Sequence, residues 1–259
     1  MTGDELLKYL RSGERVLALG IRASRTAEVV RWAKVAGYHT IWIDMEHSTL
    51  PVDVVSQMCL CARDVGLMPW VRVPEREYGV INRVLDGGAL GIVIARVESA
   101  EQARTAVTAT RFPPLGQRSQ IATLPTVDYA RLPAREFNER IDAATALKVL
   151  IESGAGVEAA DAIAAVEGVD VVALGCNDLS ADLGHPGEPS HPEVVAACRR
   201  VVEAAARHRK IAIVGGMPEG DALDSLRRAG AAPFVFAGID SDLFLAALRE
   251  RADAARRAP

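Results

Sequence analysis

The chain is predicted to fold as one (β/α)8 barrel (TIM barrel) of the α/β class, and three observations predict it. Its 259 residues match the usual size of such a barrel. Short apolar runs alternate with longer amphipathic segments, as in consecutive strand–helix units. The short runs are rich in Val and Ile and nearly continuous, which is typical of parallel strands buried on both faces. A doubly wound open sheet is the alternative.

Eight short apolar runs are predicted as the strands. They are Val16–Gly20, Thr40–Asp44, Pro69–Val73, Gly91–Ala95, Lys148–Ile151, Val169–Leu174, Ile211–Val214 and Phe234–Ala237. Eight strand–helix alternations in a chain of this length favour a closed parallel barrel over an open sheet.

Eight amphipathic segments are predicted as the helices. They are Ser24–Ala36, Val52–Val65, Glu77–Leu85, Ala100–Thr110, Ala155–Val166, Pro192–His208, Pro218–Gly230 and Asp240–Arg256. Ser24 is expected to cap the first of them, because a serine side chain accepts a hydrogen bond from a free N–H at a helix start.

One connection, from Arg111 to about Thr145, is unusually long. Compact domains seldom keep long idle loops, so this connection is expected to be functional or to cover a site. Its second half, Arg131–Ala143, is expected to form a short helix. There is no low-complexity linker and no repeat of fixed period, which predicts a single domain over residues 1–259.

The composition argues against several classes of partner. A formal net charge of −4 gives no footprint for nucleic acid or an anionic membrane. No apolar run approaches the roughly 18 residues of a membrane span, and the N-terminus does not read as a signal peptide. The cysteines lack a C-x-x-C pair, so Cys59, Cys61 and Cys198 are interpreted as buried free thiols. A cytoplasmic enzyme is the expectation.

Polar residues at the carboxyl ends of the predicted strands are candidates for the site, because barrel enzymes build their sites there. Asp44 and His47 follow the second strand. The carboxylate of Asp44 is expected to orient one ring nitrogen of His47 while the other faces substrate; an exposed histidine is the alternative. Arg72 ends the third strand, and a buried cation needs an anion. That anion is either a ligand carboxylate or phosphate, or an intramolecular partner.

Two carboxylates follow adjacent strands. Glu152 comes after the fifth strand and Asp178 after the sixth. Carboxylates buried side by side must be neutralised, and a hard divalent cation does this with oxygen ligands while leaving positions for substrate. The alternative is that Asp178 caps the following turn while Glu152 pairs with an arginine. The sequence therefore predicts a divalent metal as cofactor.

These motifs together resemble the HpcH/HpaI family of metal-dependent pyruvate aldolases over nearly the whole chain. The segments that carry the resemblance are IDMEHS (43–48), VRVPE (71–75), LDGGALGIV (85–93), RFPPLGQR (111–118), LIES (150–153), GVDVVALGCNDLSADLG (168–184) and FVFAGID (234–240). The resemblance implies a class II aldolase, a carbon–carbon lyase. It would cleave or form 4-hydroxy-2-oxo acids through a pyruvate-type enolate and an aldehyde.

The resemblance also implies roles for individual residues. Glu152 and Asp178 would bind Mg²⁺, Mn²⁺ or Co²⁺, Arg72 would contact the pyruvate carboxylate, and His47 with Asp44 would be the acid/base pair. Asp86 would be a structural or interface residue. Further substrate contacts are expected around the mouth, where glycines let the backbone approach a ligand: Gly20, Gly216 and Gly238, with Asn177, and with Arg22 and Ser24 toward the distal end.

The chain departs from the family's pattern around this set. Leu150, Cys176, Asn177 and Ser119 stand where the family commonly has Gln, Pro at the turn, and Gly; Ala95 and Ala18 replace a common Pro and Trp. The metal and base residues remain, so the chemistry is retained as an expectation while the natural aldehyde stays open.

Three alternatives remain. One is a citrate-lyase-like or malyl-CoA-lyase-like carbon–carbon lyase, and another is a barrel that binds a 2-oxo acid with little turnover. The third is a Schiff-base aldolase using Lys148, which shares the facing of Glu152 but lies toward the N-terminal end of its strand. Relatives assemble as trimers or hexamers, and the apolar C-terminal helix (LFLAALRERADAA) is expected to pack on a neighbouring subunit.

Overall fold

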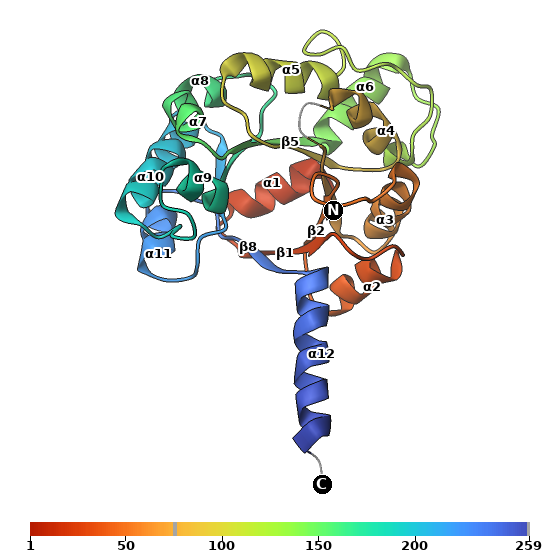
Figure 1. Cartoon of the computed structure of the whole chain (residues 1–259). Helices are drawn as coiled ribbons and strands as arrows, with labels where there is room; N and C mark the ends of the chain where they lie inside the picture. Colours follow the sequence, from red (N-terminus) through yellow and green to blue (C-terminus); the bar gives the residue numbers. More distant parts are fainter. Residues whose placement is uncertain (75–76, 258–259) are drawn as a thin grey trace.

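A ring of eight parallel strands with helices around it makes up the molecule (Figure 1), so the predicted (β/α)8 barrel is confirmed. The computed structural model describes residues 1–74 and 77–257. The strands are β1 (Val16–Ile21), β2 (Thr40–Asp44), β3 (Met68–Arg72), β4 (Gly91–Ile94), β5 (Ala146–Ile151), β6 (Val171–Gly175), β7 (Ile211–Gly215) and β8 (Phe234–Ile239). Each lies within two residues of its predicted bounds.

The barrel closes unevenly. Strands β1 to β7 pair in sequence order, and β8 pairs with β1. On its other side β7 makes an isolated bridge, from Ala212 to Ala231 in the segment that precedes β8, and the N–H of Ala232 donates to the carbonyl of Ala212 at 2.8 Å. Among the described residues, the ring therefore closes between β7 and β8 with fewer backbone pairs than join any other two neighbouring strands.

The helices follow the prediction with several differences in their bounds. They are α1 (Gly3–Arg11), α2 (Glu28–Val35), α3 (Val52–Asp64), α4 (Ile81–Asp86), α5 (Ala100–Thr110), α6 (Ala134–Ala144), α7 (Gly154–Glu158), α8 (Ala160–Ala164), α9 (Cys176–Asp182), α10 (Pro192–Arg207), α11 (Asp221–Arg228) and α12 (Asp240–Arg257), with short 3-10 helices at Tyr78–Val80 and Pro125–Val127. The predicted helix over 155–166 is broken at Ala159 into α7 and α8, and the one over 218–230 begins only after Gly220.

The predicted cap at Ser24 is wrong. Helix α2 begins at Glu28, and its N-terminal neighbour Ala27 offers no side-chain cap. The N–H of Ser24 instead donates to the carboxylate of Asp240 at 2.6 Å. This long-range hydrogen bond holds residues 22–24 in a loop, so the helix begins four residues later than predicted.

Helix α1 was not predicted, and it seals the N-terminal end of the barrel. Thr2 and Glu5 form a reciprocal capping box at its start, an arrangement that satisfies free N–H groups. Leu6, Leu7 and Leu10 on this helix pack into the same apolar cluster as the barrel interior. The interior is thus closed at this end.

Two apolar layers hold the barrel together. One fills the space between the sheet and the outer helices, and the other fills the interior, where Trp42 and Trp70 are the largest members. Gly91 of β4 belongs to this packing, because a Cβ there would lie 2.2 Å from the Trp70 ring. All four cysteines are buried and free, as predicted for three of them, and the sulfurs of Cys176 and Cys198 lie 3.7 Å apart.

The long connection after α5 packs as a unit of its own. Helix α6 confirms the predicted helix over 131–143, and Phe112, Leu124, Phe137 and Ile141 form a separate apolar cluster. Arg111 donates to the carbonyls of Asp142 and Thr145, fastening the two ends of this connection to one another.

Candidate active site

A cavity of about 510 Å³ opens at the carboxyl ends of the strands. This volume lies within the range of small-molecule sites. The predicted site residues Asp44, His47, Arg72, Glu152 and Asp178 all line it. Among the described residues, those that line the cavity include none from the long connection over 111–145. The expectation that this segment covers the site is therefore not supported.

Glu152 and Asp178 form the acidic side of the cavity. Glu152 follows β5 and is buried, and its carboxylate accepts the N–H of Arg96 at 3.0 Å. The pKa of Glu152 is raised to about 7, chiefly by burial and also by the nearby charge of Asp178, while the Arg96 N–H opposes the shift. Asp178 lies in the first turn of α9, as expected.

The backbone is shaped around the Glu152 carboxylate. A Cβ on Gly175 would lie 2.4 Å from Oε1 of Glu152, so the absence of a side chain at the end of β6 makes room for it. Arg96 adopts a left-handed conformation with φ of 50°, which is uncommon for a residue other than glycine. The missing side chain of Gly175 therefore leaves room for one carboxylate oxygen, and the N–H of Arg96 fixes the other.

Arg72 joins two acids in the structure. Its Nε and Nη2 donate to the two oxygens of Asp44 at 3.0 and 2.6 Å, and its Nη1 lies 2.8 Å from Glu46. Burial is the largest influence on Asp44 and opposes its charge, but the hydrogen bonds and the charge of Arg72, together with the N–H of His47, outweigh it and leave the pKa of Asp44 below its usual value. The intramolecular ion pair, one of the two predicted readings of Arg72, is therefore present.

The predicted contact between Asp44 and the His47 ring is wrong. The Asp44 carboxylate accepts the backbone N–H groups of Glu46 and His47 at 3.0 and 3.1 Å. The imidazole lines the cavity but is 59% exposed, with Nε2 at 3.9 Å from Glu46. The turn after β2 is so tight that Asp44 binds the backbone of the next residues, as aspartate does in Asx turns.

The predicted mouth residues also line the cavity: Gly20, Asn177, Gly216 and Gly238. Gly216 has φ of 80°, and a Cβ there would lie 3.2 Å from the amide nitrogen of Asn177. A glycine is required at this position because the left-handed backbone and the close amide both disfavour a side chain.

Arg22 lies on the opposite side, in the loop after β1. The carboxylate of Asp240 accepts the N–H groups of Arg22, Ala23 and Ser24. The guanidinium reaches Ser241 at 3.2 Å and Asp242 at 3.4 Å. Asp240 thus fixes this loop by its backbone and leaves the arginine side chain at the cavity.

An aromatic floor was missed by sequence reasoning. Trp42, Phe234 and Phe236 line the cavity, and the rings of Trp42 and Phe236 meet edge to face with centroids 5.0 Å apart. Trp42 was open to prediction, because it lies two residues before Asp44 in β2 and therefore points to the same side of the sheet. The rings from β8 carry no polar signal that marks them.

Lys148 lies deeper in the barrel than the cavity. Its amine is fully buried and faces the rings of Trp42, Trp70 and Phe234, with Nζ 4.6, 4.2 and 4.6 Å from the ring centroids. It has no hydrogen-bond partner among the described residues, and burial lowers its pKa to about 7. Lys148 is not part of the described cavity lining, which argues against the Schiff-base alternative.

Asp86, predicted as a structural or interface residue, accepts a hydrogen bond from the buried Arg118 at 2.8 Å. This ion pair connects the end of α4 to the first part of the long connection, which contains Arg118. The structural role is therefore observed within one subunit. Glu75, the last residue of the predicted VRVPE motif, lies outside the described residues.

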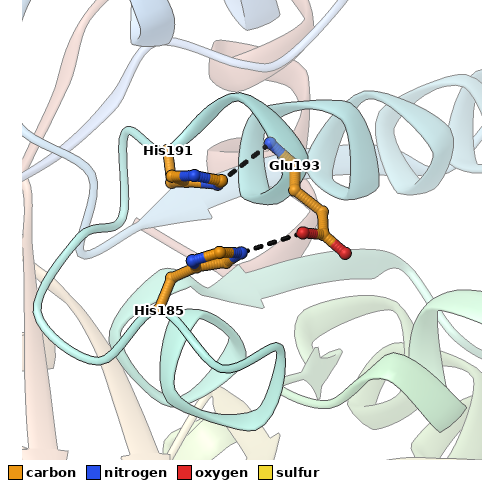
Figure 2. A group of neighbouring side chains, drawn as sticks. All are labelled: His185, His191 and Glu193. Atoms are coloured by element: carbon orange, nitrogen blue, oxygen red, sulfur yellow. Dashed lines mark hydrogen bonds and ion pairs between the residues drawn. The ribbon is translucent and has the colours of Figure 1, made fainter.

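A second cluster with metal-ligating side chains lies outside this cavity (Figure 2). His185 and His191 stack with ring centroids 3.5 Å apart, and Nε2 of His185 lies 2.8 Å from Glu193. The His191 ring accepts the N–H of Glu193 at the start of α10. Turning either ring toward a metal would break the contact that it makes, so we interpret the group as a clasp between the preceding loop and α10.

Comparison with known proteins gives one consistent result. The family model described as HpcH/HpaI aldolase/citrate lyase matches residues 22–247. A 4-hydroxy-4-methyl-2-oxoglutarate aldolase from Hapsidospora irregularis is 41% identical over 80% of this chain and 77% of its own. A 2-keto-3-deoxy-L-rhamnonate aldolase from Salmonella schwarzengrund is 34% identical over 93% and 89%. The crystal structure of an HpcH/HpaI aldolase from Desulfitobacterium hafniense superposes with a TM-score of 0.89 at 27% identity, covering 98% and 97%.

Proposed function

The chain belongs to the HpcH/HpaI aldolase/citrate lyase family and is an aldolase, and on this premise we propose that Glu152 and Asp178 bind a divalent cation. The reaction at this site is the cleavage of a 4-hydroxy-2-oxo acid to pyruvate and a carbonyl fragment, or its reverse. The observation that carries the proposal is the pair of carboxylates facing one cavity from neighbouring strand ends.

The donor set fits a cation. Burial and the charge of Asp178 both disfavour ionised Glu152, and a cation between the two carboxylates would remove that penalty. Carboxylate oxygens are ligands that Mg²⁺ and Mn²⁺ prefer, and the missing side chain of Gly175 leaves the space at Oε1. Mg²⁺, Mn²⁺ and Co²⁺ are the candidates.

The metal, when bound, would act as a Lewis acid on the 2-oxo group of the substrate, which would lower the activation barrier by several kcal/mol. The protein supplies the rest. Arg72 adds positive charge where negative charge develops, and its bonds to Asp44 and Glu46 fix the guanidinium in one orientation. We assign it the contact with the pyruvate carboxylate.

His47 is proposed as the general base that removes the proton of the 4-hydroxyl group. Its ring lines the cavity and is accessible, and its backbone is fixed by Asp44. Asp44 therefore acts on His47 through the turn and on Arg72 through an ion pair. Gly20, Gly216 and Asn177 complete the proposed substrate contacts.

The test is pyruvate release from a racemic 4-hydroxy-2-oxo acid, followed by a lactate dehydrogenase assay. We expect activity to vanish on treatment with EDTA and to return with Mg²⁺, Mn²⁺ or Co²⁺. Activity that persists without metal would contradict the roles given to Glu152 and Asp178, and reduction with borohydride in the presence of pyruvate would then test Lys148.

We also propose that α12 packs on a neighbouring subunit in a trimer or hexamer. Figure 1 shows this helix projecting away from the barrel. None of its residues is buried within the described chain, and Leu243, Phe244, Leu245 and Leu248 are exposed. An apolar surface of this kind on a helix marks an interface.

A double substitution tests the assembly. Phe244→Ser with Leu248→Ser is expected to lower the molar mass measured by light scattering from that of an oligomer to that of the monomer. An unchanged mass would remove α12 from the interface.

Four buried free thiols support a reducing, cytoplasmic setting. No helix among the described residues is long and apolar enough to cross a membrane.

A further inference from the structure

We propose that Arg22 makes the site selective for substrates whose carbonyl fragment carries a carboxylate of its own. The substrate class is then a 4-hydroxy-2-oxo diacid, cleaved to pyruvate and a second oxo acid. This inference rests on the proposed function, because it takes Glu152 and Asp178 as the end of the cavity where the pyruvate half binds.

The cavity has two chemically different ends. Glu152 follows β5 and Arg22 follows β1, and in a ring of eight strands in sequential order these two strands lie opposite one another. Both residues line the same cavity. A substrate held at one end by the cation on Glu152 and Asp178 therefore extends toward the guanidinium of Arg22 at the other end.

Arg22 is less committed to its partners than Arg72. Arg72 is held by three bonds of 2.6 to 3.0 Å to two largely buried acids. Arg22 has a single ion pair, with Asp242 at 3.4 Å, and the two side chains are 35% and 66% exposed. Exposed ion pairs of this kind contribute little, so an incoming carboxylate can take the place of Asp242.

The space between the two ends is apolar. Trp42, Phe234 and Phe236 line it, a surface that suits a short carbon chain better than a polyhydroxylated one. A carboxylate at the far end of such a chain must find a cation once it leaves water. The described residues that line the cavity include two arginines, Arg22 and Arg72. Arg72 is assigned to the carboxylate of the pyruvate half, so Arg22 is the cation left for the distal carboxylate.

The first experiment compares two substrates with Arg22→Gln. The diacid is 4-hydroxy-4-methyl-2-oxoglutarate, and the monoacid is 4-hydroxy-2-oxopentanoate, which releases acetaldehyde. The loss of a charged hydrogen bond is expected to lower kcat/KM for the diacid by about 10-fold to 100-fold, chiefly through KM. For the monoacid we expect a change of less than about twofold, because no partner is lost.

Two matched variants separate binding from folding of the loop. Arg25→Gln alters the neighbouring arginine, whose guanidinium donates to the carbonyls of Arg22 and Ala23, and it should leave the ratio between the two substrates unchanged. Asp242→Asn removes the competing anion and should lower KM for the diacid. Equal losses on both substrates in Arg22→Gln, or no loss on the diacid, would overturn the proposal.

A binding measurement keeps this inference separate from the proposed function. In the presence of Mg²⁺, calorimetry with 2-oxoglutarate and 2-oxopentanoate compares two 2-oxo acids of equal chain length that differ in the distal carboxylate. We expect tighter binding of 2-oxoglutarate by at least about tenfold, lost in Arg22→Gln. If wild-type protein cleaves neither 4-hydroxy acid, the proposed function fails. Equal affinity for the two ligands is the separate result that overturns the role of Arg22.

Discussion

Lys148 lies on β5 and Glu152 directly follows that strand, four residues later on the same side, yet their surroundings differ. Burial brings the pKa of each side chain to about 7, lowering it for the amine and raising it for the carboxyl. The physical cause is the same, since a low-dielectric interior disfavours the charged form of either group.

The two sites differ in what each charge can reach. Glu152 faces the cavity, accepts one N–H and lies beside Asp178. Lys148 is enclosed by three aromatic rings and has no hydrogen-bond partner in the described part of the chain. A ligand can neutralise the first charge and cannot reach the second. We therefore expect Glu152 to matter for activity and Lys148 for stability.

The largest expected effect is that of Glu152→Gln. This variant keeps the shape of the side chain and removes its negative charge, so the metal loses a ligand and kcat/KM should fall by about 10³-fold or more. The melting temperature should stay equal or rise, because a neutral group avoids the burial penalty. A large loss of stability with little loss of activity would reverse the comparison.

His47→Ala tests the same side of the comparison one step from the metal. Loss of a general base should lower kcat by at least about 100-fold, while the affinity for Mn²⁺, measured by calorimetry, stays nearly unchanged. Normal turnover in this variant would remove His47 from the mechanism.

Lys148→Met tests the sealed charge. Methionine fills a similar space without a buried donor, and chemical denaturation should show a gain of about 1–3 kcal/mol in the free energy of unfolding, with kcat/KM within about twofold. The folded pKa is lowered below the unfolded value of 10.5, so stability of the wild type should rise with pH from about 7 to 10.5. The variant should lose that rise.

The pH dependence of metal binding sharpens the comparison from the acidic side. Glu152 must lose its proton to bind a cation, and its pKa lies near 7 instead of 4.5. Affinity for Mn²⁺ should therefore fall by about tenfold per pH unit below 7. In the metal-free protein the raised pKa has the opposite sign for folding, because this carboxyl group destabilises the fold as pH rises from about 4.5 to 7. Flat affinity between pH 5.5 and 7 would contradict the pKa.

The smallest effect is expected for His185, whose ring contacts Glu193 near the surface. His185→Ala breaks the contact with Glu193 shown in Figure 2, and exposed pairs contribute about 0–1 kcal/mol. The melting temperature should fall slightly and kcat/KM should not change. A fall in melting temperature larger than that of Glu152→Gln or Lys148→Met would mean that the contact between His185 and Glu193 stabilises more of the fold than the loop before α10.

The sequence was sufficient for the strands because their apolar runs are bounded by polar residues at the ends that form the cavity. It also identified Asp44, Arg72, Glu152 and Asp178 at those ends, all of which line the cavity. It was misleading for the Asp44–His47 contact, because residue spacing does not distinguish a side chain from the backbone N–H beside it. The loop held by Asp240 was beyond local patterns, since its partners lie 216 to 218 residues away in the chain.

That carboxylate has a consequence for how the protein is made. Asp240 supplies the acceptors for the N–H groups of Arg22 and Ser24, and β8 beside it completes the edge of β1. On the ribosome the first loop of the cavity is synthesised early and gains these bonds only when the final helix has emerged. Chains released before residue 240 would carry both metal carboxylates and still lack an ordered Arg22 loop.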